Sequence, residues 1–405
     1  MSTNSRPIAA RPGSTCRLAS MRSTFPGHQN GLTLVELLVS MTISMFMLIA
    51  ISLVYISAKT GFAYSNNTVR MSEDASFALE MMGRDIRMAG YAGCTGSDVL
   101  TAAGPPVVTT LVPRLDLVDG QLIAAPANRP NPFAGVIAGD LSQIFTSRNA
   151  VWGFAANNTN ALSVLGGGAT TYTLSTTNPV LYLAGGSPRA LQIGAAIVTP
   201  PGTANISIAA DTYRWANNTN PTFMIIADCR GSEVFRASSV SAAAPFTIAH
   251  AATANDNADF FNAYGADAIV TPLVTSVYFV ATRLGATTPS LYRRFFNGSV
   301  ATTEELVPNV EAIAFEYGEN TSNVVATGAP TFRADVYRTN PTTVVNWSRI
   351  VSVRMGLILV SEEDNKATVA GQTVQWISGT YTPPTDLRLR RAYSTTVSVR
   401  NRVGL

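Results

Sequence analysis

An uncharged apolar run near the N-terminus constrains this chain more than any other feature. From Leu37 to Ala58 the sequence has no formally charged residue and is rich in Leu, Ile, Met and Val. As an α-helix this run is about 33 Å long, which is enough to cross a hydrocarbon core of about 30 Å. Residues 1–31 contain four arginines and no acidic residue. We therefore expect the N-terminus to stay in the cytoplasm and the residues after the run to be exported.

A single carboxylate, Glu36, lies directly before the run, and three interpretations account for it differently. A cleaved signal peptide fits the basic leader, but the run is too long and residues 56–58 form a poor small-x-small cleavage site. A plain single-pass anchor would place Glu36 in the headgroup region, where the helix dipole favours a negative charge. Cleavage after Gly31 would instead give Leu32 a free, charged amine four residues before the carboxylate.

The segment GLTLVELLVS, residues 31–40, resembles the type IV prepilin signature: a glycine, a hydrophobic residue, Thr-Leu, and a glutamate five residues after the glycine. In that family an inner-membrane peptidase cleaves after the glycine and methylates the new N-terminus. The resemblance implies that Gly31 is the cleavage residue, Leu32 the new N-terminus and Glu36 the carboxylate that pairs with a neighbouring subunit's amine. Leu32 replaces the usual phenylalanine, and the 31-residue leader is long, which makes Met21 an alternative start.

The energetics of an intramembrane carboxylate agree with this interpretation. An unpaired carboxylate inside a membrane helix costs about 2.5–3.5 kcal/mol on insertion scales. A neighbour's ammonium offsets that cost only when the subunits stack in one register. The charge on Glu36 would then select the geometry of assembly.

The chain becomes amphipathic after Lys59, and we expect one long helix from residue 32 to residue 89. Its buried face is predicted from a spacing of three and four residues; the residues are Ala75, Leu79, Met82 and Ile86. Gly61 and the pair Asn66-Asn67 are expected to loosen the helix, and Gly90 and Gly93 to end it. The predicted organisation is a leader (1–31), a transmembrane or filament-core half-helix (32–58), an amphipathic half-helix (59–93) and an exported head (94–405).

The head has the turn-rich composition of a β-structure. Residues 221–239 predict two strands around a turn at Arg230-Gly231. In VEAIAFEYG (310–318), alternation predicts a half-buried strand. In IVSVRMGLILVS (350–361), Arg354 is expected opposite an apolar face; that face comprises Val351, Val353, Met355, Leu357 and Leu359. The predicted fold class is α+β, type IV pilin-like, with a long N-terminal helix packed on an antiparallel sheet and a strand-rich insertion.

Several stretches resemble the large PilW-like minor pilins in particular. They are RDIRMAGYAGC (84–94), ADCRGSEVFRAS (227–238), LYRRFFN to EAIAFEYG (291–318), IVSVRMGLILVS (350–361) and LRRAYSTTVSVRNR (389–402). Together they cover most of residues 32–94 and 222–405 in the expected order. Residues 96–220 match no stretch of that family and are expected to form a variable, surface-facing part.

Cleavage after Gly31 would remove Cys16 and leave two cysteines, Cys94 and Cys229. In an exported head, which lies in an oxidising compartment, we expect these two to form a disulfide between the end of the helix and a strand. It would close a loop of about 135 residues, which chain-entropy arguments value at roughly 4–5 kcal/mol as an upper figure. Two buried free thiols are the alternative.

The sequence offers little catalytic chemistry, and we predict no enzyme, metal or cofactor site. His250 is the only histidine after cleavage and is expected to be packed or solvated. Acidic turns at 256–259 and 364–365 lack the spacing of a calcium loop. Alternation along the last strand is expected to place several of the C-terminal arginines on a solvated sheet face, with contact to DNA or acidic partners as the alternative; they are Arg388, Arg390, Arg391, Arg400 and Arg402. Without the leader's arginines, 24 basic residues face 25 acidic ones, so the charge gives no argument for nucleic acid.

The resemblance implies a minor pilin, anchored in the bacterial inner membrane before assembly and carried on a surface pilus afterwards. The implied partners are other minor and major pilins, the prepilin peptidase and the inner-membrane assembly machinery. A head of more than 300 residues favours a few copies at a tip or priming complex over a long shaft. A type II secretion pseudopilin and a pilus-tip adhesin that binds through residues 96–220 are the alternatives.

Overall fold

The structure, a computed structural model of the 405-residue chain, describes most of the helix and the head. The described residues are 33–93, 150–156, 171–197, 205–215, 223–228, 232–250, 260, 263–298, 301–321, 333–345, 347–364, 367 and 370–402, with three two-residue strands between 112 and 122. The chain divides into two compact units, residues 1–61 and 62–405.

The helix α1 runs from Leu34 to Met88, 55 residues. It continues through Gly61 and Asn66-Asn67, so the predicted loosening at these residues does not interrupt it. One glycine and two asparagines lower helix propensity by only about 1 kcal/mol or less each, which a helix of this length tolerates. Gly90 and Gly93 follow with φ angles of 75° and 74°, a left-handed conformation that glycine adopts without strain. The predicted end of the helix is therefore confirmed.

Among the described residues, twelve strands form the larger sheet, whose main path is β14-β13-β12-β9-β10-β11-β8. Its strands are β1 (Val112–Pro113), β4 (Val151–Phe154), β5 (Tyr172–Leu174), β6 (Val180–Gly186), β7 (Leu191–Gln192), β8 (Ile206–Ser207), β9 (Phe223–Ala227), β10 (Ser232–Val240), β11 (Thr247–His250), β12 (Ile269–Arg283), β13 (Ser290–Phe296) and β14 (Ala301–Val307). The 15-residue β12 pairs with β13, β9, β5, β6 and β7, all antiparallel. β9 and β10 form the hairpin expected around residues 230–231.

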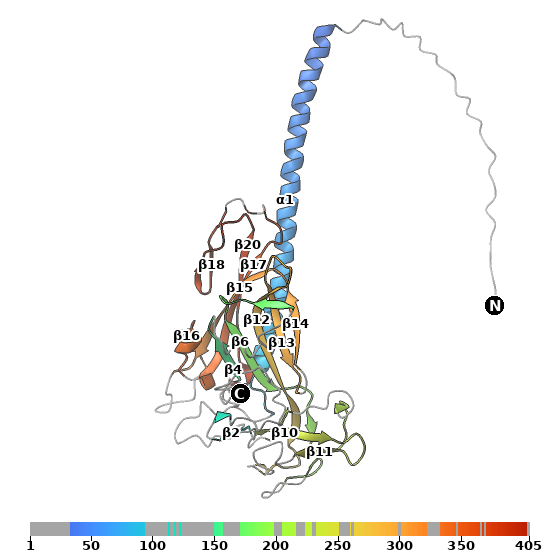
Figure 1. The fold of residues 1–405 in the computed structure, drawn as a ribbon, viewed down its shortest axis with the longest axis vertical. Helices are drawn as coiled ribbons and strands as arrows, with labels where there is room; N and C mark the ends of the chain where they lie inside the picture. The colour runs from blue at the N-terminus through green and yellow to red at the C-terminus, as the bar shows by residue number, and fades with distance from the viewer. Residues whose placement is uncertain are drawn as a thin grey trace, which may run out of the picture. The chain divides into compact units, whose positions relative to one another are not determined.

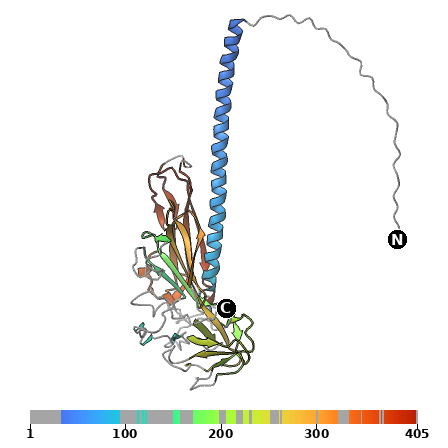
Figure 2. The ribbon, with the colours of Figure 1, turned by 45° about the vertical axis from the view of Figure 1, so that its right-hand side comes forward.

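A second, smaller sheet has the order β16-β15-β17-β20 in the described part of the head. The remaining elements are β15 (Val310–Glu319), β16 (Val336–Arg338), β17 (Ile350–Val360), β20 (Arg390–Ser398), the hairpins β2 (Leu117–Val118) with β3 (Gln121–Leu122) and β18 (Val374–Trp376) with β19 (Gly379–Tyr381), and three short 3-10 helices, η4 (Pro341–Thr343), η5 (Trp347–Arg349) and η6 (Arg400–Arg402). In Figures 1 and 2, β10 and β11 lie at the opposite end of the head from β18 and β20.

The second half of α1 is the centre of the main hydrophobic core. Its buried residues are Met71, Ala75, Ala78, Met82 and Ile86. The same core takes side chains from the larger sheet, such as Leu183 and Tyr278, and from the smaller sheet, such as Phe315 and Met355. The predicted buried face is confirmed at Ala75, Met82 and Ile86, while Leu79 is half-buried against the core. The predicted α+β class, a long N-terminal helix packed on antiparallel sheet, is therefore confirmed.

Strand β15 departs from the predicted half-buried pattern, because both of its faces are covered. Phe315 and Tyr317 face the α1 core, but Ala314 and Glu316 on the other face are only 7% and 6% exposed. The β18–β19 hairpin covers part of that face: a Cβ on Gly356, which pairs with Ala314, would lie 2.9 Å from the Ile377 side chain. Alternation in the sequence cannot reveal a cover made by residues 60 positions away.

The apolar face predicted for β17 lies in the core under α1. Val353, Met355, Leu357 and Leu359 all join that core, and Arg354 lies on the opposite face. Val351 is buried but outside the core cluster, because the pairing of β15 with β17 shifts register between Gly318 and Glu319.

The segment 96–220 is not purely surface-facing, which corrects the expectation for its described part. Strand β6 lies between β4 and β12, and its Leu181 and Leu183 are 0% and 2% exposed within the main core. Val151 of β4 joins the same core. Deleting the whole segment would remove core strands, so a test of adhesion by deletion has to leave β4 and β6 in place.

Replacing Gly153 with alanine is expected to destabilise the head by about 1–3 kcal/mol through overpacking. A Cβ at this position in β4 would clash with the hydroxyl of Tyr317, whose side chain is 0% exposed. Urea unfolding of the solubilised protein measures the change. Gly61→Ala is the matched control, since a Cβ there meets nothing within 4 Å and alanine favours the helix. Equal urea midpoints for Gly153→Ala and the wild type would contradict this prediction.

Candidate functional site

The described residues begin at Thr33, so Gly31 and Leu32 of the prepilin-like signature lie outside them. Glu36 lies in the first turn of α1. The Glu36 amide donates to the Thr33 hydroxyl at 3.3 Å, and the Thr33 amide donates to the Glu36 carboxylate at 3.1 Å. This reciprocal pair is a capping box, in which the first helical N–H groups and the glutamate satisfy one another. The spacing Thr-x-x-Glu before an apolar run could have revealed it from the sequence.

The apolar part of α1 in the first unit has no cover within the described chain. Leu34, Phe46 and Val54 are 76%, 74% and 70% exposed, and other large apolar side chains along this segment are similarly open. Its hydroxyl groups are satisfied within the helix: Ser40 donates to the Leu37 carbonyl and Ser44 to the Ser40 carbonyl. By length and composition this helix is able to cross a membrane. A surface of this kind is stable only in lipid or against apolar partners.

A polar cluster around Asp85 fastens α1 to the larger sheet. The hydroxyls of Ser276 and Tyr278 on β12 each donate to the Asp85 carboxylate at 2.7 Å. Arg293 on β13 forms an ion pair with the same carboxylate at 3.0 Å, and its guanidinium lies over the Phe295 ring. Burial, and next the nearby Asp85 carboxylate, raise the pKa of the Tyr278 hydroxyl, so it remains a donor at every physiological pH.

Removing the Asp85 carboxylate is expected to destabilise the head by about 2–3 kcal/mol, because charge-assisted hydrogen bonds are lost and the Arg293 charge loses its most buried partner. The change Asp85→Ala is compared with Glu80→Ala, an exposed position on the same helix that should shift stability by less than about 0.5 kcal/mol. Urea midpoints of both variants give the measurement. Equal shifts for the two variants would contradict a fastening role for Asp85.

Arg390 is not one of the C-terminal arginines that lie on a solvated face. Its side chain is 4% exposed and makes ion pairs with Glu311 and Asp386. Its guanidinium donates to Asp386 at 2.8 Å and to Glu311 at 3.1 Å. These hydrogen bonds hold the pKa of the Asp386 carboxyl below its ordinary value. Alternation along β20 did not reveal two carboxylates brought in from β15 and the loop before β20.

Two other candidate residues, His250 and Asp364, pack or form hydrogen bonds within the head. His250 is 8% exposed and packs 4.6 Å from the Phe260 ring, which confirms that it is a packed histidine. The Asp364 carboxylate accepts a hydrogen bond from the Leu387 amide, whereas the acidic turn at 256–259 lies outside the described residues. Within those residues, no group of three or more His, Cys, Asp and Glu could hold a metal ion.

Cys94 and Cys229 both lie outside the described residues, but their described neighbours are close together. A Cβ on Gly93 would lie 3.0 Å from the Cβ of Ala227. The chain therefore approaches itself one residue before Cys94 and two residues before Cys229.

The comparisons with known proteins agree with this geometry. Residues 27–52 match the prokaryotic N-terminal methylation motif. Residues 277–401, from within β12 to η6, match the family of type IV pilus-assembly protein W. The predicted resemblance is thereby confirmed: the chain carries the methylation motif and a C-terminal segment that matches the family of pilus-assembly protein W. The second of these families is described as a pilus-assembly protein.

Comparison with solved structures and curated proteins adds less. A type IV-like pilin from Thermus thermophilus is 16% identical over 33% of this chain and 69% of its own, with a TM-score of 0.19. That score is too low for the likeness to bear on the fold. No curated protein matches the chain.

Proposed function

We propose that this chain is a minor pilin, cleaved after Gly31 and incorporated in few copies into a complex that primes or caps type IV pilus assembly. The observation that carries the proposal is the apolar half of α1, which is exposed along its length and overlaps the methylation motif at residues 27–52. The match to pilus-assembly protein W supports a role in assembly. The head, 312 residues from 94 to 405, favours a tip or priming position, since repeated copies would pack poorly in a long shaft.

In this proposal the prepilin peptidase removes residues 1–31 and Leu32 becomes the methylated N-terminus. Before assembly the helix lies in the inner membrane with the head in the periplasm, and afterwards the subunit is on the surface pilus. N-terminal sequencing of the protein isolated from membranes and from sheared pili tests this. The expected product begins with methylated Leu32; a chain that keeps its arginine-bearing leader would overturn the proposal.

We also propose a disulfide between Cys94 and Cys229, supported by the approach of Gly93 to Ala227. Non-reducing mass spectrometry of the exported protein should find the two cysteine peptides joined, and reduction should lower the urea midpoint, in the direction expected for a loop of about 135 residues. Both thiols free in the exported protein would contradict the pairing. Cys94→Ser with Cys229→Ser serves as the control for reduction.

A pseudopilin of a type II secretion system shares the same anchor and is the competing assignment. The match to pilus-assembly protein W favours the pilus. Deleting the gene separates the two: loss of twitching with normal exoprotein secretion supports the minor pilin, and the reverse phenotype supports the pseudopilin.

A further inference from the structure

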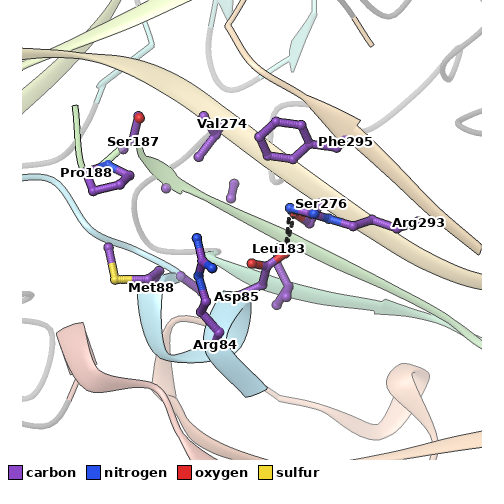
Figure 3. A pocket seen from close by; sticks show the side chains of 14 residues that line it. Arg84, Asp85, Met88, Leu183, Ser187, Pro188, Val274, Ser276, Arg293 and Phe295 are labelled. Carbon is purple, nitrogen blue, oxygen red and sulfur yellow. Dashed lines mark hydrogen bonds and ion pairs between the residues drawn. The ribbon is translucent and has the colours of Figure 1, made fainter. Parts of the chain in front are cut away.

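A cleft of about 390 Å³ opens where the end of α1 meets the larger sheet. Figure 3 shows Arg84, Asp85 and Met88 of the helix on one side and Phe295 and Val274 of the sheet across from them. Except for Asp85 and the two arginines, the labelled lining is mostly apolar or small. A cleft of this kind, largely apolar with a few polar groups, is typical of a binding site.

The charged side chains around the cleft differ in whether they are paired within the head. The Asp85 carboxylate is already bound by Ser276, Tyr278 and Arg293, so its charge is neutralised inside the head. Arg84 is exposed on the rim and makes no hydrogen bond or ion pair with any described residue. The cleft therefore offers an uncompensated guanidinium beside an apolar floor, which complements a carboxylate flanked by an apolar group.

An apolar stripe on the outward face of α1 leads to this cleft. Phe62, Val69, Phe77 and Arg84 follow one another at intervals of seven, eight and seven residues, close to two helical turns each. The three apolar side chains are 75%, 50% and 49% exposed, and they lie opposite the face that packs on the sheets. A protein segment that lay along this stripe would reach Arg84 at the end of the stripe.

We propose that the stripe and cleft receive an element of a neighbouring pilin, whose acidic side chain, next to an apolar one, enters the cleft and pairs with Arg84. This inference rests on the proposed function, because it requires other pilins in the assembly. The occupant is a protein segment rather than a small anion, since the apolar stripe extends the contact surface over three further side chains. Asp85 is not available to repel the carboxylate, because Ser276, Tyr278 and Arg293 hold it.

The test is site-specific photo-crosslinking of the full-length protein in cells. A photoreactive residue replaces Pro188, which is exposed and lines the cleft, and in a control strain replaces Leu284, which is 74% exposed outside it. The expected result is a crosslink from position 188 to a pilin peptide that contains Asp or Glu beside an apolar residue. No crosslink, or a crosslink only to lipid, would overturn the inference.

The second part of the test reverses the charge of Arg84 at the rim of the cleft. We expect Arg84→Glu to lower the crosslink yield from position 188 by about tenfold, because two carboxylates would then face each other. Arg87→Glu, an exposed arginine on the same helix outside the cleft lining, should change the yield by less than about twofold. An equal loss in both variants would overturn the role of Arg84. The urea midpoint of each variant checks that the head remains folded.

The same samples separate this inference from the proposed function. A methylated Leu32 and pilus-associated wild-type protein, together with an unchanged crosslink in Arg84→Glu, would defeat only the cleft. A wild-type chain that is neither processed nor pilus-associated would defeat the minor pilin itself.

Discussion

Replacing Arg390 with methionine is expected to lower the free energy of unfolding of the head by about 3–5 kcal/mol, the largest stability effect that we predict for a single residue. Its side chain is 4% exposed and neutralises Glu311 and Asp386, whose side chains are 14% and 23% exposed. Without the guanidinium, two partly buried carboxylates would face each other unpaired, and breaking a buried ion pair costs about this much. Urea unfolding of the solubilised protein measures the change.

The neighbouring Arg391 provides the matched control for Arg390. It lies on the same strand, is only half-buried, and makes a hydrogen bond to the Tyr64 hydroxyl at 3.2 Å near the surface. Arg391→Met should therefore shift stability by about 1 kcal/mol or less. Similar losses in the two variants would show that the strand responds to any loss of charge and that the buried cluster has no special role.

The pH dependence of stability gives a second measurement of the Arg390 cluster. Because the pKa of Asp386 is lower in the folded state, its contribution is present above the unfolded value of about 3.9 and is lost as the pH falls through the folded value. The wild type should lose this contribution in acid, whereas Arg390→Met should lack it at every pH. A variant that retained the wild-type acid dependence would contradict the assignment.

Replacing Glu36 with glutamine is expected to lower incorporation into pili by about 60- to 300-fold, because a neighbour's charged amine would be left unpaired in the apolar core at a cost of about 2.5–3.5 kcal/mol. Glutamine still supplies an acceptor for the capping box but carries no charge. Processing after Gly31 should continue, so the protein would accumulate in the membrane. The ratio of pilus-associated to membrane-bound protein, measured by immunoblot, gives the result.

Thr33→Val separates the charge of Glu36 from its role as a cap. The variant removes the hydroxyl that accepts a hydrogen bond from the Glu36 amide, and it leaves the carboxylate in place. Loss of a cap costs about 0.5–2 kcal/mol, so incorporation should fall far less than in Glu36→Gln. If Thr33→Val were the more damaging change and Glu36→Gln assembled normally, the carboxylate would act as a helix cap and not as the partner of an amine.

The sequence predicted the elements that depend on local pattern. The charge-free run after Glu36, the spacing of Ala75, Met82 and Ile86, and the glycine at position 90 were sufficient for the long helix, its buried face and its end. Such signals are readable because a helix satisfies its backbone hydrogen bonds within itself, so its boundaries and faces depend on residues a few positions apart.

The tertiary structure decided the features that depend on distant partners. Nothing near Arg390 in the sequence indicates that Glu311 lies beside it, and nothing near Glu316 indicates that a hairpin 60 residues later helps to cover its face of the sheet. The Asp85 cluster and the cleft with Arg84 likewise need β12 and β13 to meet the end of α1. Pairing and burial across a sheet are set by which strands become neighbours, and a side chain's charge or exposure there depends on residues that a local pattern cannot contain.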